Sequence, residues 1–286
     1  MLVDEKGQAI QEGIAVPPLT DRQREEAEDR TSVTALIIHE AIRQDGDEEL
    51  IRPSSALAWS GLAAGMSMGF SLVAEGLLRA HLPNAPWSPL VVSLGYPLGF
   101  LIVIIGRQQL FTENTLTAII PLLARRNLPT LVSVARLWTV VLIANLAGAH
   151  LMAWALGTTP LCSPEVRHAI HELAIEAAAA PFGTALLRGI FAGWLIAMVV
   201  WLNAATESRI PVIVILTYVV GLAGLTHIVA GSVEYLFLVM TGERTWFAYL
   251  TGYMLPSLIG NSIGGVALVS ALNHAQVIAG SPQGKR

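Results

Sequence analysis

Two polar interruptions in long apolar stretches hold the side chains that could do chemistry. The first covers residues 106–114 and contains Thr112, and the second covers residues 221–232 and contains His227. A threonine hydroxyl and an imidazole both donate hydrogen bonds, and histidine exchanges a proton near neutral pH. Irregular backbone at membrane depth survives only where protein or a water-filled cavity satisfies it. We therefore predict that Thr112 and His227 face each other across a passage for a small polar solute.

The composition places these interruptions in an integral membrane protein. Of the 286 residues, 53% are hydrophobic and only 13% are charged, whereas a soluble domain carries about 25% charged residues. The net charge of −4 offers no basic footprint for nucleic acid. A single cysteine, Cys162, excludes an internal disulfide and a cysteine-based metal centre. We expect no metal, no cofactor and no nucleic-acid partner.

Enzyme motifs are weak in this chain. The segment 39–43 starts with His-Glu but lacks the second histidine of a zinc-protease motif, and no glycine-rich phosphate-binding loop occurs. His168, His171 and Glu172 share a helical segment, but a metal site would need further ligands. We interpret that segment as a solvated outer face and predict that the protein is not an enzyme.

The charged residues divide the chain into a polar tail and a membrane body. Residues 1–52 hold 6 basic and 13 acidic side chains, half of all the charge. We expect an acidic cytoplasmic tail at 1–52, a six-helix transmembrane pore domain at 53–276 and a cytoplasmic C-terminal tail at 277–286. Within the first tail, apolar residues recur at helical spacing and predict an amphipathic helix that lies either on the membrane surface or on the protein itself. These residues are Val33, Leu36, Ile37, Ala41 and Ile42.

Uncharged stretches predict an all-α fold with six membrane-spanning helices, since a span needs roughly 20 apolar residues. The expected helices cover about 54–79, 89–124, 130–157, 183–206, 210–240 and 246–276. We interpret the second as one crossing with an interruption. Ser163-Pro164-Glu165 is typical of a helix start and predicts an outer helix over about 164–180.

Basic residues set the expected orientation, because cytoplasmic loops are enriched in Lys and Arg. With six spans both termini lie on one side. That side carries Arg43, Arg52, Arg125, Arg126, Arg136, Arg209, Lys285 and Arg286. The other side carries Arg79, Arg167, Arg188 and Arg244. Both termini are therefore expected in the cytoplasm.

The two halves of the body resemble each other. The segment 61–65, Gly-Leu-Ala-Ala-Gly, matches 189–193, Gly-Ile-Phe-Ala-Gly, and Asn145-x-x-Gly148 matches Asn261-x-x-Gly264. Three spans followed by three related spans have opposite orientations, which is the inverted-repeat plan of many transport proteins. The two interruptions fall in the second span of each half, and Thr112 and His227 are 115 positions apart. We therefore predict an inverted 3+3 repeat with helices 2 and 5 broken.

At these residues the sequence resembles the formate/nitrite transporter family. The resemblance covers about residues 53–276. Its motifs are Gln109-Leu-Phe-Thr112, Leu225-Thr-His227, Asn145-x-x-Gly148 and Gly260-Asn261-x-x-Gly264-Gly265. The resemblance implies an aquaporin-like protomer in a homopentamer, surrounded by the lipid of a bacterial cytoplasmic (inner) membrane. Each protomer would form a channel for small monovalent anions such as formate or nitrite, with co-transported protons as a further option.

The resemblance also implies roles for individual residues. His227 matches the family's central pore histidine, and Thr112 matches the threonine that faces it. Leu110 and Phe111 match the loop beside that threonine. The remaining apolar constriction positions fall on Tyr96, Phe100 and Val220.

Some positions depart from the family pattern. Thr226 stands where an acidic residue often precedes the histidine, and Gly193 stands where an asparagine is expected. Arg107 and Glu234 are additional membrane charges. We expect Arg107 either to pair with Glu113 or Glu234 or to attract the anion, and we expect Glu75 to face water or a neighbouring protomer.

Two alternatives stay open. A channel for small neutral solutes would prefer glycerol over every anion. A membrane sensor or scaffold would bind a ligand without flux. In the favoured interpretation, His227 donates a hydrogen bond or shares a proton, so that a weak acid crosses the apolar rings in effectively protonated form.

Overall fold

The computed structural model describes residue 20 and residues 34–280, and every regular element in this part of the chain is helical. The tail segments expected at 1–33 and 281–286 lie, apart from Thr20, outside the described residues. Five helical stretches are long and apolar enough to cross a membrane. They are α3 (Ser54–His81), Ser88–Ile105, α8 (Leu128–Thr158), α10 (Phe182–Ala205) and Trp246–Ala279.

Two of these stretches consist of several shorter elements. Ser88–Ile105 comprises α4 (Ser88–Val92), the 3₁₀ turn η1 (Ser93–Gly95) and α5 (Pro97–Ile105). Trp246–Ala279 runs through two π-helical segments, which often mark irregular contacts inside a longer helix. Its elements are α13 (Trp246–Tyr249), η2 (Leu250–Met254), α14 (Leu255–Ser262), η3 (Ile263–Ala271) and α15 (Leu272–Gly280).

The helix ends at both polar interruptions have the same local cause. After α5, Arg107 adopts a left-handed backbone with φ 50°, and the Gln108 N–H donates to Val103 O at 2.9 Å. After α11 (Arg209–Leu222), Gly224 adopts φ 57°, and the Leu225 N–H donates to Val220 O at 3.0 Å. This hydrogen bond together with a left-handed residue is the Schellman motif, which terminates a helix.

The chain becomes helical again at α6 (Asn114–Thr117) and α7 (Ile119–Arg125) in the first half and at α12 (Ala230–Met240) in the second. The stretch over 210–240, which we expected to be an interrupted span, comprises two helices of 14 and 11 residues. Neither alone reaches the roughly 20 residues that a span needs.

Glycines bring two helix pairs into close contact. A Cβ added at Gly65 of α3 would lie 2.0 Å from the Asn145 carbonyl oxygen of α8, and one at Gly193 of α10 would lie 2.3 Å from the Asn261 carbonyl oxygen of α14. Only glycine fits at such distances, and small residues at membrane helix contacts serve this purpose. The sequence repeat thus corresponds to two similar helix contacts.

We expect Gly65→Ala to destabilise the protein by about 3 kcal/mol, because the new methyl group must displace backbone. The measurement is the thermal unfolding midpoint of the purified protein in detergent. Gly183→Ala in α10 is the matched control, since a Cβ there meets nothing within 4 Å. Equal midpoints for the two variants would contradict the close contact of α3 with α8.

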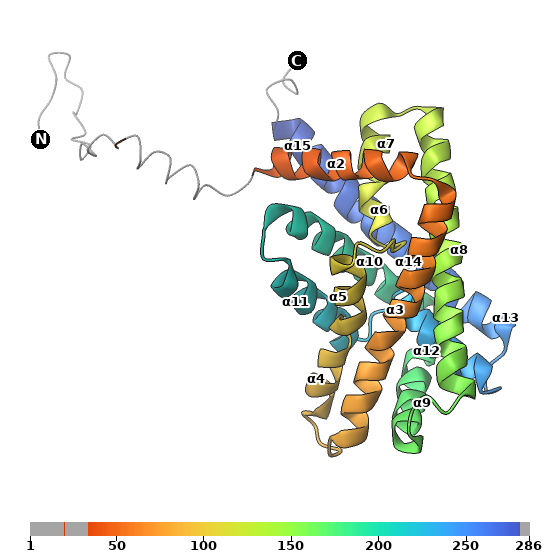
Figure 1. The fold of residues 1–286 in the computed structure, drawn as a ribbon. Coiled ribbons are helices and arrows are strands. Elements are labelled where there is room, and N and C mark those ends of the chain that lie inside the picture. Colours follow the sequence, from red (N-terminus) through yellow and green to blue (C-terminus); the bar gives the residue numbers. More distant parts are fainter. Residues whose placement is uncertain (1–19, 21–33, 281–286) are drawn as a thin grey trace, which may run out of the picture. The chain divides into compact units, whose positions relative to one another are not determined.

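The two ends of the helical body differ. Helices α2 (Ala35–Ile51), α7 and α15 lie at one end, and α9 (Pro164–Ala178) lies at the opposite end against α3 and α12 (Figure 1). The expected start of α9 is confirmed, because the Ser163 side chain accepts a hydrogen bond from the Val166 N–H and Glu165 lies in the first turn.

Only part of the apolar stripe expected for α2 packs against the protein. Ile42 is buried, but Leu36 is 60% exposed and Ile37 is 58% exposed. The helix packs instead through Ile38, Ile42, Gly46 and Leu50, because these residues share the face turned toward α7, α10 and α15. His39 on this face lies 2.9 Å from His274 of α15, and burial together with that neighbour lowers the pKa of His39.

Candidate functional site

Thr112 and His227 meet inside the helical body. Thr112 Oγ1 lies 2.8 Å from His227 Nε2, and both residues are completely buried. Each comes from one of the two non-helical segments, 106–113 and 223–229, that interrupt the helices. The structure therefore brings together the two polar side chains that the sequence placed in separate halves.

The hydrogen bonds of His227 fix its tautomer. Nδ1 lies 3.3 Å from the Val229 nitrogen and 3.2 Å from the Ala230 nitrogen, and both are backbone N–H donors at the start of α12. Because a backbone N–H can only donate, Nδ1 accepts and carries no proton. In the neutral ring Nε2 then carries the proton and donates to Thr112 Oγ1. The Thr112 hydroxyl has no other partner among the described residues, so its own proton can be donated to a solute.

Two asparagines hold the non-helical segments. The Asn145 amide donates to Gly61 O and Gln109 O, both at 2.8 Å, and accepts from the Phe111 N–H at 2.9 Å. Asn261 makes the same three bonds in the other half, with Gly189 O at 2.8 Å, Thr226 O at 2.9 Å and the Ile228 N–H at 2.8 Å. Both side chains are completely buried. They satisfy backbone groups that the interrupted helices leave free.

These bonds define how the two halves correspond. They match Gln109 with Thr226 and Phe111 with Ile228, and each pair is 117 positions apart (226 − 109 and 228 − 111). The counterpart of His227 is therefore Leu110. The repeat read from the sequence paired Thr112 with His227, which are 115 positions apart. This spacing is two residues shorter than the 117 positions that the asparagine bonds give.

An apolar cluster surrounds the pair. The rings of Phe100 and His227 lie 5.1 Å apart in an edge arrangement, and those of Tyr96 and Phe100 lie 5.4 Å apart. All of the expected constriction residues are buried in this one cluster. They are Tyr96, Phe100, Leu110, Phe111 and Val220.

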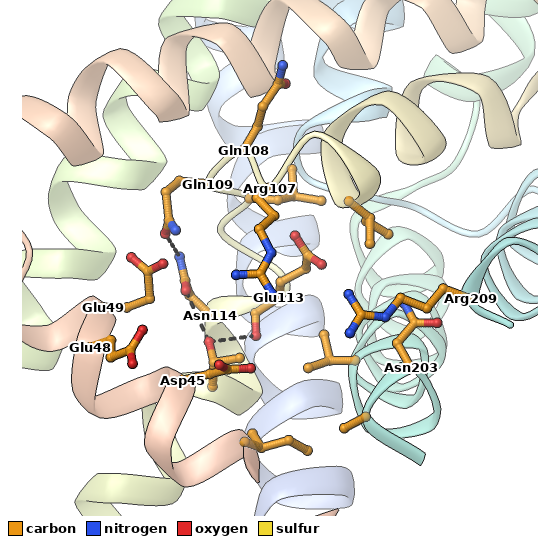
Figure 2. Close-up of a pocket in the computed structure, with 16 residues that line it drawn as sticks. Asp45, Glu48, Glu49, Arg107, Gln108, Gln109, Glu113, Asn114, Asn203 and Arg209 are labelled. Carbon is orange, nitrogen blue, oxygen red and sulfur yellow. Dashed lines mark hydrogen bonds between the residues drawn. The ribbon is translucent and has the colours of Figure 1, made fainter. Parts of the chain in front are cut away.

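A cavity lies on each side of the cluster. The α2-side cavity, about 190 Å³, is lined by α2, by the first non-helical segment including Leu110, and by the facing ends of α10 and α11 (Figure 2). The α9-side cavity, about 250 Å³, is lined by Tyr96, Val220, Thr226 and residues of α9 and α12. Leu110 borders the first cavity and Tyr96 borders the second, so the cluster with Thr112 and His227 separates them.

Arg107 forms neither of the ion pairs considered from the sequence. It lines the α2-side cavity together with Arg209 and Glu113 (Figure 2), whereas Glu234 lines the α9-side cavity. Among the described residues no carboxylate lies within ion-pair distance of Arg107. The Arg107 side chain lies in the cavity (Figure 2), where its guanidinium is available to a solute.

Several acidic residues of the cavities were not expected. Asp45, Glu48 and Glu49 of α2 line the α2-side cavity, and their i, i+3, i+4 spacing was a detectable signal for one helical face. Glu75 was expected to face water or a neighbouring protomer, but it is only 7% exposed and lines the α9-side cavity. Its burial follows from the position of α9, which covers this end of α3.

One serine motif matches the hydrolase pattern by letters alone. Gly65-Met-Ser67-Met-Gly69 reads Gly-x-Ser-x-Gly, so the prediction that the sequence contains no such nucleophile motif is wrong. A hydrolase nucleophile sits on a sharp turn between a strand and a helix. Ser67 lies instead inside the continuous helix α3. The motif therefore carries no hydrolase site.

Comparison with known proteins identifies the family. The family profile described as "Formate/nitrite transporter" matches residues 37–275. The chain belongs to the formate/nitrite transporter family. Within this family of transporters and channels, the chain is 42% identical over 251 residues to "Inner membrane protein YfdC" of Escherichia coli (strain K12), covering 87% of this chain and 81% of that protein.

Solved structures of the formate/nitrite transporter family share the fold. An "FNT family ion channel" aligns with a TM-score of 0.71 at 18% identity, over 84% of this chain and 98% of that one. A "Pentameric formate channel with formate bound" aligns with a TM-score of 0.63 at 18% identity, over 82% and 98% of the two chains. The all-helical architecture of the described residues is thus that of formate/nitrite transporter channels.

The structure explains two departures from the formate/nitrite transporter pattern. Gly193 stands where asparagine was expected because α14 passes too close for any side chain. The Thr226 hydroxyl donates to Ala185 O of α10 at 2.6 Å, so this residue ties the second non-helical segment to its neighbour.

Proposed function

We propose that this protein is a passive or proton-linked transmembrane channel or transporter for small monovalent weak-acid anions such as formate or nitrite. The observation that carries the proposal is the Thr112–His227 pair, 2.8 Å apart, buried in an apolar cluster between two cavities. Family membership supports the transport of a small anion.

The proposed mechanism follows from the cost of charge in apolar surroundings. An anion loses its hydration when it enters the apolar cluster. It meets Tyr96, Phe100 and Val220 on one side of the cluster and Leu110 and Phe111 on the other. The Thr112 hydroxyl, polarised by the His227 Nε2–H, offers one strong donor at the midpoint. A weak acid can also cross carrying its proton, which removes most of this cost.

We further propose a six-span protomer with an inverted 3+3 repeat. In this plan α4 to α7 form the second span and α11 with α12 form the fifth, each broken at its non-helical segment. The matching asparagine bonds and the matching helix ends at Arg107 and Gly224 support this plan. Assembly as a homopentamer in an inner membrane, with both termini cytoplasmic, is proposed from the relatives and from the basic residues near α2 and α7.

The test is flux in proteoliposomes that contain the full chain. Formate, nitrite, acetate, lactate and glycerol are compared across a pH series. We expect the monovalent weak acids to pass faster as the outside pH falls, and glycerol to pass poorly. Preference for glycerol over every anion would overturn the proposal.

A channel for neutral solutes is the second candidate function. The acidic residues in both cavities favour it, because Asp45, Glu48 and Glu49 on one side and Glu75 and Glu234 on the other oppose an anion when they are ionised. The glycerol arm of the flux measurement decides between the two candidates.

We expect Arg107→Gly to lower formate flux about threefold at low ionic strength and less at high salt, because it removes an exposed positive charge from the α2-side cavity. The same change relaxes a left-handed backbone and raises stability by about 1 kcal/mol. Arg126→Gly is the matched control, since Arg126 has φ 49° and lies outside both cavities. Equal flux in the two variants would show that Arg107 does not attract the anion.

A further inference from the structure

The α9-side cavity is lined by two carboxyl groups that form no ion pair among the described residues. Glu75 of α3 is only 7% exposed, and Glu234 of α12 is half-buried. Among the described residues neither side chain has a hydrogen bond or an ion pair. A third carboxyl in the cavity, Glu176 of α9, differs because it forms an ion pair with Arg79 Nη2 at 2.9 Å.

Tyrosines make an independent second feature of the same cavity. Tyr96 is 5% exposed and lines the cavity, yet its hydroxyl has no hydrogen-bond partner among the described residues. Because Tyr96 lines the cavity, its hydroxyl can hydrogen-bond a solute or water there. The Tyr253 hydroxyl, also on the cavity wall, donates to His227 O at 3.3 Å.

The cavity leads directly to the central pair. Tyr96 contacts Phe100, and Phe100 contacts the His227 ring, with ring centres 5.4 Å and 5.1 Å apart. A solute that leaves the carboxyl groups therefore meets Tyr96, then the apolar cluster, then Thr112 and His227. Glu75 and Glu234 therefore lie in the cavity that a solute occupies before it enters the apolar cluster.

The surrounding charges do not neutralise Glu75 and Glu234. On the neighbouring elements, Arg79 is already engaged by Glu172 and Glu176. Arg188 of α10 is exposed and also lines this cavity, but among the described residues it forms no ion pair with Glu75 or Glu234. An isolated carboxylate is expensive to bury, so such a group holds either a proton or a bound cation.

We propose that Glu75 and Glu234 form a proton-exchange pair that protonates a weak-acid anion in the α9-side cavity before it enters the apolar cluster. This inference rests on the proposed weak-acid transport. In the step, the O–H bond of the protonated carboxyl breaks and an O–H bond to the oxygen of the anion forms. The resulting carboxylate recovers a proton from hydronium that reaches it through the water of the cavity, and in the reverse direction the neutral acid returns its proton to the pair.

The proposal also sets the class of substrate. Transfer between two carboxyl-like groups is nearly balanced in energy, which is the condition for rapid proton exchange. The anion of a strong acid, such as chloride or nitrate, cannot accept the proton and is therefore rejected at the cluster. The Tyr96 hydroxyl is placed to hydrogen-bond the anion while the proton moves.

The test compares the wild-type chain with the double variant E75Q E234Q in proteoliposomes that contain an internal pH-sensitive dye. We expect labelled formate uptake at pH 7 to fall about 100-fold in the double variant, the usual order for a lost general acid, and to recover toward wild type at pH 5, where bulk water supplies the proton. The variant E75D E234D, which keeps both carboxyls, should retain uptake. Glu243→Gln, at the exposed His171 contact, should change nothing.

Each outcome is decisive. Wild-type uptake in E75Q E234Q, or a loss that is equal at every pH, overturns the proton-exchange pair and leaves the weak-acid function standing. If uptake by the wild-type chain requires external sodium and not protons, Glu75 and Glu234 bind a cation, and the proton-exchange proposal is also overturned. A wild-type chain that transports no weak acid overturns the proposed function together with this inference. If the double variant folds poorly, infrared absorption of protonated carboxyl groups is measured at neutral pH in the wild type and in E75D E234D. Signals of two protonated carboxyls are expected in each, and their absence overturns the proposal.

Discussion

Replacing His227 with leucine is expected to reduce formate flux about 100-fold, since a buried polar group left without its hydrogen bond at the midpoint costs up to about 3 kcal/mol. The loss arises because leucine removes the Nε2–H that polarises Thr112 and offers nothing in its place. The measurement is the initial rate of labelled formate uptake into proteoliposomes, at several outside pH values.

Matched variants separate chemistry from folding. His227→Asn keeps a side-chain oxygen that can accept from the Val229 and Ala230 N–H groups, so it should fold like wild type and still transport poorly. Thr112→Ser retains the hydroxyl and should transport, whereas Thr112→Val has the same shape without it and should not. Unchanged flux and pH dependence in His227→Leu would remove the central pair from the mechanism.

Replacing Asn145 or Asn261 with leucine is expected to destabilise the protein by about 3 kcal/mol each. Either change removes three buried hydrogen bonds to backbone groups, and each lost hydrogen bond costs about 1 kcal/mol. The thermal unfolding midpoint of the detergent-solubilised protein measures the effect. Because the two side chains make equivalent bonds in the two halves, the losses should be similar.

Asn203→Leu is the control for this prediction. Asn203 is 9% exposed, but its side-chain oxygen has no hydrogen-bond partner in the described part of the chain. Removing an unpartnered buried amide costs little and can be favourable. A midpoint for Asn203→Leu as low as that of Asn145→Leu would indicate that the loss reflects the size of leucine and not the missing bonds.

The proposed path combines a narrow apolar middle with charged cavities at its two ends. The α2-side cavity places Arg107 and Arg209 opposite Asp45, Glu48 and Glu49, so its net attraction for an anion depends on the balance between them (Figure 2). The α9-side cavity has a surplus of carboxyls. This asymmetry makes the two sides chemically distinct, and it predicts that pH acts mainly from the side of α9.

Much of the helical architecture follows from the sequence. The helix bounds expected at 54–79, 130–157 and 183–206 differ from α3, α8 and α10 by at most two residues, because uncharged apolar runs of that length must be helical in a membrane. The start of α9 follows from Ser163 and Pro164, since capping depends on adjacent residues. The roles of Asn145 and Asn261 as hydrogen-bonding residues between helices were also predictable from their type.

Other features depend on neighbours that lie far away in the chain. The face that α2 buries is selected by α7, α10 and α15, and Leu36 and Ile37 on its other face stay exposed. Glu75 is buried because α9 covers it, which no local pattern reports. The structural register of 117 positions between the halves appears only through the bonds of the two asparagines, since the glycine motifs allow several offsets.

By itself the sequence determined that the chain is helical, where its membrane body is interrupted, and which hydroxyl and imidazole lie in those interruptions. Hydropathy, helix capping and residue type depend only on residues that are close together in the chain, so they can be predicted from the sequence alone. Only the tertiary structure decided that Thr112 Oγ1 and His227 Nε2 lie 2.8 Å apart, which ring nitrogen donates, and that Glu75 and Glu234 share one cavity. Distances, tautomers and counter-ions depend on groups from several helices, and their positions are set by close packing rather than by sequence spacing.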